Sequence, residues 1–154
     1  MFPTNRFVQV FVSISLMLGV ATEASADDLR SPDAVKAGLY KLAAEYGDME
    51  RKLTSERYDR LPHENEEFQD ESKLLRTAVA HEPADFKAKV ESALQSSLTA
   101  ATHVADVSAT HDKGQVTAAL ENLSTLLQSL NALFPENLRT EPGTVKKSRP
   151  ASAR

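Results

Sequence analysis

The feature that most constrains this chain is an apolar side chain recurring every fourth and third residue. In residues 32–55 the spacing is 4-3-4-3-4, through Val35, Leu39, Leu42, Tyr46, Met49 and Leu53. That alternation puts one apolar side chain on the same face at each turn, so it predicts an amphipathic α-helix. Ser31 and Pro32 suit the N-cap and the first turn of this helix.

Three further segments carry apolar sides of different character. Residues 63–80 are the least hydrophobic, with Phe68, Leu74, Leu75, Ala78 and Val79. Residues 83–110 carry a stripe rich in alanine and serine, namely Phe86, Val90, Ala93, Ser97, Ala101, Val104 and Ser108. The last stripe is Val116, Leu120, Leu123, Leu127, Leu130 and Phe134, and Pro135 predicts that its helix ends or kinks at Phe134. The chain therefore predicts four helices.

The connections between these segments are mostly short, and no segment has the alternating pattern of a strand. Four amphipathic helices with short connections can bury all four stripes around one axis. We therefore expect an all-α fold, an antiparallel up-down-up-down four-helix bundle. A dimer of helical hairpins is the main alternative, and a homodimer of the bundle stays open.

The first 26 residues have the pattern of a secretory signal peptide. A basic Arg6 precedes an apolar run, and Ala24-Ser25-Ala26 fits the small-residue cleavage site. We expect cleavage after Ala26 and a periplasmic or secreted protein without a stable membrane anchor; an uncleaved anchor is the alternative. The domain prediction is thus a signal peptide at 1–26, a bundle at 27–139 and a disordered basic tail at 140–154.

Composition excludes several functions. The chain has no cysteine, which rules out disulfides, thiolate metal sites, thiol redox chemistry and covalent haem attachment. The net charge is −4, and six carboxylates concentrate in residues 59–71. An acidic body argues against a nucleic-acid partner. No nucleophile turn or phosphate loop is present, so we expect a protein that is not an enzyme.

Two histidines predict an alternative role in metal binding. In an up-down bundle His63 and His111 lie at the same end, with Glu64, Glu67 and Asp112 close by. Imidazoles with carboxylates can hold Zn²⁺, Cu²⁺ or Ni²⁺. The competing interpretation is that histidines at helix ends are exposed and bind nothing.

A second candidate site is a ligand cavity beside the third helix. Small side chains there allow either close approach of a neighbouring helix or space for a small apolar ligand. The cavity prediction names Ser97, Ala101, His103 and Leu127. If His103 faces the interior, a non-covalently held haem and electron transfer become a further alternative.

Residues 112–139, DKGQVTAALENLSTLLQSLNALFPENLR, resemble the last helix of cytochromes c-prime and of the soluble b-type cytochrome with the same bundle. Gly114, Val116, Ala119 and Leu123 match that pattern, as does the pair Leu138-Arg139. Counted back from Arg139, the haem-attaching C-x-x-C-H falls on residues 131–135. Asn131 and Phe134 stand at the two cysteine positions and Pro135 at the histidine position.

The resemblance implies a haem-less relative that keeps the scaffold and has lost the haem ligands. We therefore expect no resident cofactor, with a divalent metal as the alternative and haem disfavoured. The expected function is non-catalytic binding of a partner protein or a small apolar ligand. The alternatives are a periplasmic metal-binding or metal-sensing module and a non-covalent haem protein.

Overall fold

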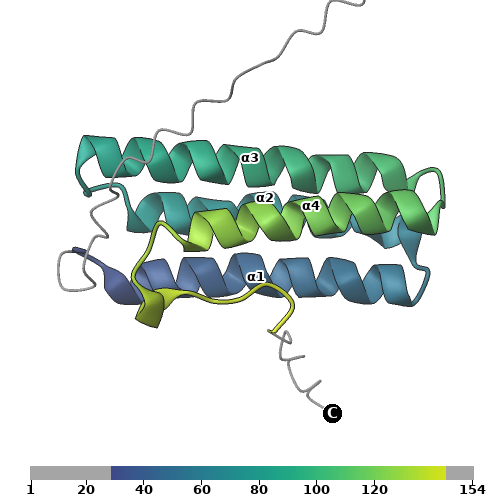
Figure 1. Cartoon of the computed structure of the whole chain (residues 1–154), viewed down its shortest axis with the longest axis horizontal. Helices are drawn as coiled ribbons and strands as arrows, with labels where there is room; N and C mark the ends of the chain where they lie inside the picture. The colour runs from purple at the N-terminus through teal and green to yellow at the C-terminus, as the bar shows by residue number, and fades with distance from the viewer. Residues whose placement is uncertain (1–28, 145–154) are drawn as a thin grey trace, which may run out of the picture.

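The computed structural model describes residues 29–144, so the predicted signal peptide and residues 145–154 lie outside the described part. Within it the chain is helical, with four α-helices and no strand (Figure 1). The prediction of an all-α fold with four helices is confirmed. The α-helices are α1 (Pro32–Thr54), α2 (Leu61–Ala78), α3 (Ala84–Ser108) and α4 (Lys113–Asn131), and the short 3-10 helices are η2 (Tyr58–Arg60) and η3 (Glu136–Leu138).

The four helices lie side by side with their axes roughly aligned (Figure 1). α1 packs most extensively against α2, and α3 against α4, while α2 also contacts α3. Beyond α4 the chain turns back and runs along α1 (Figure 1), which η3 contacts. α1 therefore has neighbours on several sides, and all its residues from Leu42 to Met49 except Asp48 are buried.

The core consists of the apolar stripes that define the helices. All six stripe residues of α4 and the following turn, from Val116 to Phe134, are buried, as are Val35, Leu39, Leu42, Tyr46 and Met49 of α1. Leu53, Phe86 and Ala93 are partly buried against this core, and one stripe residue is exposed. Leu74 is 47% exposed, because Leu75 occupies the core-facing position where α2 meets α1.

α1 and α2 approach each other closely at Gly38. A Cβ at this position would lie 3.0 Å from the Cα of Leu75 and 3.1 Å from its Cβ. A side chain at this position would push Leu75 away, so the close contact favours glycine. Gly38, which weakens the helix as an isolated segment, is therefore what lets the two helices pack.

Residues 132–144, here called the strap, connect the end of α4 to the surface of α1. The side chain of Asn131 holds the strap through two hydrogen bonds. Its Nδ2 donates to the Thr140 carbonyl at 2.9 Å, and the Thr140 amide donates to its Oδ1 at 3.1 Å. Arg139 Nε also donates to the Phe134 carbonyl at 2.7 Å. The first five residues of the predicted tail, 140–144, thus belong to the described part of the chain.

Phe134 and Pro135, which the sequence resemblance aligns with haem-motif positions, have structural roles in the strap. Phe134 is buried and packs edge-on against Phe86, with ring centroids 5.6 Å apart. Pro135 immediately precedes η3. α4 ends at Asn131, three residues before the predicted end.

No helix in residues 29–144 combines the length and the apolar character needed to cross a bilayer.

Candidate functional site

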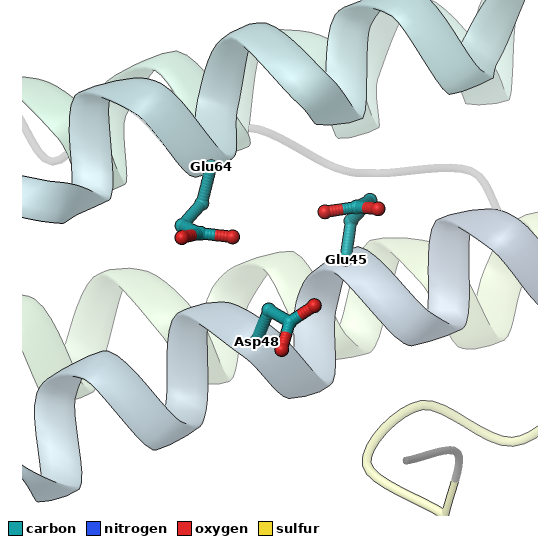
Figure 2. Close-up of side chains that lie close together, drawn as sticks. All are labelled: Glu45, Asp48 and Glu64. Carbon is teal, nitrogen blue, oxygen red and sulfur yellow. The ribbon is translucent and has the colours of Figure 1, made fainter. Parts of the chain in front are cut away.

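Three carboxylates meet between α1 and α2 (Figure 2), and they are here called the acidic cluster. Glu45 and Asp48 come from α1 and Glu64 from α2, and one carboxylate oxygen of each lies within 4.8 Å of the others. Glu45 is 1% exposed and Glu64 6% exposed. Three acidic groups so close together in a helix interface need positive charge nearby, because each ionised group loses hydration on burial.

Two basic residues supply part of that charge. Arg51 pairs with Asp48 along α1, and Lys52 Nζ lies 3.3 Å from Glu64 Oε1 across the interface. The arrangement can act as a structural ion-pair network between α1 and α2. It could also hold a hard divalent cation such as Mg²⁺ or Ca²⁺, since these ions prefer carboxylate oxygens.

The second candidate site is an open groove between α2 and α3, here called the α2–α3 groove. Its volume is about 980 Å³. Most of its lining residues carry hydroxyl, amide or charged groups, although apolar atoms make up slightly more than half of the lining surface. The lining residues are Glu66, Gln69, Asp70, Ser72, Lys73, Arg76, Gln95, Leu98, Thr99, Thr102, His103 and Asp106.

Most of the five residues predicted to bind metal have separate structural contacts. His63 lies beside Glu66 and Glu67 of its own helix, at 3.8 and 3.5 Å. His111 stacks on Tyr58, with ring centroids 5.4 Å apart, and adopts φ +55° in the turn before α4. Among the described residues, only the acidic cluster brings three candidate ligand groups within 4.8 Å of one another, and it includes Glu64 alone of the predicted set.

Asp112 is the N-cap of α4. Its Oδ1 accepts a hydrogen bond from the Gln115 amide at 3.1 Å, and its Oδ2 accepts one from Gln115 Nε2 at 3.1 Å. These bonds, the backbone one first, lower the pKa of the Asp112 carboxyl because they favour its charged form. The residue thus caps a helix and stabilises its first turn.

The predicted ligand cavity is filled by packing. Ser97, Ala101 and Leu127 are buried at 0%, 0% and 2% exposure, and Ser97 Oγ donates back to the Ala93 carbonyl at 3.0 Å. The gap that Leu127 lines against α1 has no room for a water molecule. The small residues of α3 therefore serve close helix packing. His103 is exposed and lines the α2–α3 groove.

A buried tyrosine adds one further ionisable group. Tyr46 is 5% exposed, and its hydroxyl donates to Glu50 Oε1 at 3.0 Å. Desolvation raises the pKa of Tyr46 to about 12, and the neighbouring Glu50 adds to the shift. Glu50 in turn lies beside Gly143 of the strap.

Part of the acidic cluster leaves a signal in the sequence. Glu45 lies three residues after Leu42 and four before Met49, so it occupies the apolar stripe of α1. Glu64 has the same relation to Leu61 and Phe68 in α2. A carboxylate on an apolar stripe points to a buried charge with a partner. The pairing of Glu45 with Glu64 depends on how the two helices are aligned, which neither stripe specifies.

Comparisons of the chain with protein-family models, with curated proteins and with solved structures give no match.

Proposed function

We propose that this chain is an exported, non-catalytic protein that binds a partner protein in the α2–α3 groove. The observation that carries the proposal is the groove itself, an open space of about 980 Å³ between two helices. We further propose that the helices form an antiparallel up-down-up-down bundle of cytochrome c-prime-like ancestry. Connections at alternating ends in Figure 1 support the antiparallel order. The ancestry rests on the sequence pattern of residues 112–139.

A partner protein fits the groove better than a small apolar ligand does. Pockets for small molecules enclose most of the ligand, whereas this groove is open along its length and most of its lining residues carry polar or charged groups. The positions predicted to leave internal space, Ser97, Ala101 and Leu127, are packed. Since His103 is exposed, nothing favours an interior haem.

Two threonines give a matched test of partner binding. Thr99 lines the groove, and Thr125 lies on α4 outside it; both are exposed, and each donates its hydroxyl to the carbonyl four residues earlier at 3.0 Å. In the native host, a tagged full chain should capture a partner that Thr99→Arg loses and Thr125→Arg keeps. Equal capture by both variants would contradict a partner site in the groove.

The second candidate is divalent-cation binding, and the acidic cluster favours it. Three carboxylates from two helices converge, with one oxygen of each within 4.8 Å of the others, and Glu45 and Glu64 are buried. The proposed ion belongs to the hard, oxygen-preferring class of Mg²⁺ and Ca²⁺. The metal site proposed here is therefore at the α1–α2 interface and not at the histidines that the sequence predicted.

Calorimetric titration of the purified chain with Mg²⁺ and with Ca²⁺ tests this candidate. We expect binding of one ion that is lost in Glu64→Gln and retained in His63→Ala/His111→Ala, with circular dichroism confirming the fold of each variant. No binding by the parent, or unchanged binding by Glu64→Gln, would leave the cluster as a structural network only.

A further inference from the structure

The charges of the α2–α3 groove are unevenly distributed. Both basic residues in its lining are already paired: Lys73 Nζ lies 2.6 Å from Asp70 Oδ1, and Arg76 Nη2 lies 2.8 Å from Glu91 Oε1. Glu66 and Asp106 remain as the acidic groups of the lining. Among residues 29–144, His63 is the one basic residue within 4.0 Å of the Glu66 carboxylate, at 3.8 Å. No cation of the described residues lies within 4.0 Å of Asp106.

These two carboxylates lie toward one end of the groove. Glu66 belongs to the second turn of α2 and Asp106 to the last turn of α3, and Figure 1 places the start of α2 and the end of α3 at the same end. α3 has no basic residue in its last turn. His103 is the remaining titratable residue there. This end of the groove is therefore electronegative.

The middle of the groove offers uncharged hydrogen-bonding groups. The side-chain amides of Gln69 and Gln95 form no hydrogen bond with any described residue. Each amide has both donor and acceptor atoms, so it can pair with the N–H and C=O groups of a peptide backbone. An amphipathic helix would instead place a row of apolar side chains in a hydrophobic groove, whereas Leu98 is the one aliphatic residue among the polar and charged residues of this lining.

We propose that the partner segment in this groove is an extended cationic peptide, with a lysine or arginine at the Glu66–Asp106 end and its backbone against Gln69 and Gln95. The inference rests on the proposed function and adds the chemical class of the partner. Opposite charge at one end fixes the direction of the peptide and speeds its association.

Fluorescence polarisation with the full chain tests the charge requirement. The probe is a labelled peptide of alternating lysine and threonine, and its counterpart carries glutamate for lysine. Glu66→Gln/Asp106→Asn should weaken binding of the lysine peptide by about tenfold or more. The control Glu121→Gln/Glu136→Gln removes the same charge from exposed positions outside the groove and should change the affinity by less than about twofold.

Equal weakening by the two double variants would overturn the proposal, because binding would then follow net charge. It would also be overturned if the lysine peptide did not bind the parent, or if the glutamate peptide bound equally well. Partner capture that is lost in Thr99→Arg, together with a failed peptide test, would contradict the cationic segment and leave the proposed function standing. Capture that survives Thr99→Arg would contradict the proposed function itself.

Discussion

Asn131 shows how a residue that the sequence resemblance aligns with a haem-attaching cysteine serves the fold. Its amide satisfies both backbone groups of Thr140, nine residues further along the chain. A cysteine here would attach haem in the family that the sequence resembles. The sequence shows that the cysteines needed for haem attachment are absent. It does not show the contact between Asn131 and Thr140, because that contact forms only when the strap turns back toward α4.

Replacing Asn131 with alanine should release the strap. Each net hydrogen bond contributes about 0.5–1.5 kcal/mol, so the loss of two should cost about 1–3 kcal/mol of unfolding free energy. The Thr140 amide should also exchange its hydrogen faster. Asn122→Ala, at an exposed α4 position whose side chain forms no hydrogen bond with a described residue, is the control. Unchanged exchange at Thr140 would contradict the strap contact.

Tyr46 makes stability sensitive to alkaline pH. Its pKa of about 12 in the folded chain exceeds the usual 10.0, so the folded state favours the neutral phenol. The contribution of the neutral Tyr46 side chain to the unfolding free energy is complete below pH 10 and is lost as the pH rises toward 12. In an ultraviolet titration, one of the three tyrosines should ionise late. Tyr46→Phe should remove that phase and Tyr40→Phe should keep it; a late phase that persists in Tyr46→Phe would be contrary to this assignment.

At the scale of elements, the apolar stripes predict helix positions well and helix contacts poorly. α1 and α3 begin and end within two residues of the prediction, because burial of a stripe requires helical periodicity. Ser31 takes the predicted N-cap position but makes no side-chain capping bond. Glu45 and Glu64 are on their stripes, yet their meeting depends on the alignment of two helices that Gly38 and Leu75 bring together.

The contact at Gly38 makes a direct prediction for the α1–α2 interface. Gly38→Ala places a Cβ 3.0 Å from the Leu75 backbone, and relieving that overlap should cost about 1–3 kcal/mol. In Gly114→Ala the nearest atom is Asp112 Oδ1 at 3.2 Å, at the end of a side chain. That control should stay within about 1 kcal/mol of the parent. Chemical denaturation measures the unfolding free energy of both variants. Equal stability of the two would show that α1 and α2 can move apart at Gly38 without cost.

The N-caps of α1 and α4 should differ in strength. Asp112 accepts a hydrogen bond from the Gln115 amide, whereas Ser31 makes no such bond. Asp112→Ala should therefore lower the unfolding free energy by about 0.5–2 kcal/mol, and Ser31→Ala should lower it by less. Thermal unfolding of the two variants at neutral pH gives the comparison, and a larger loss for Ser31→Ala would reverse our assignment.

At the scale of the whole molecule, the interior is packed and the open volume lies outside, between α2 and α3. The small residues of α3 close the helix interface, so the internal ligand site expected at Ser97, Ala101 and Leu127 is replaced by contacts. The acidic character of residues 59–71 is readable in the sequence, but the groove that Glu66 and Asp70 help to line requires α3 beside α2. The proposed binding site therefore lies on the surface of the molecule, between α2 and α3, and not in its core.

Site-specific photo-crosslinking tests the central claim most directly, because it reports which surface touches a partner in the native host. Thr99, in the groove, and Thr125, on α4, would each be replaced by a photoreactive amino acid in the full chain. The account predicts a discrete crosslinked partner from position 99 and none from position 125. Crosslinks of the same partner from both positions, or from position 125 alone, would contradict binding in the α2–α3 groove.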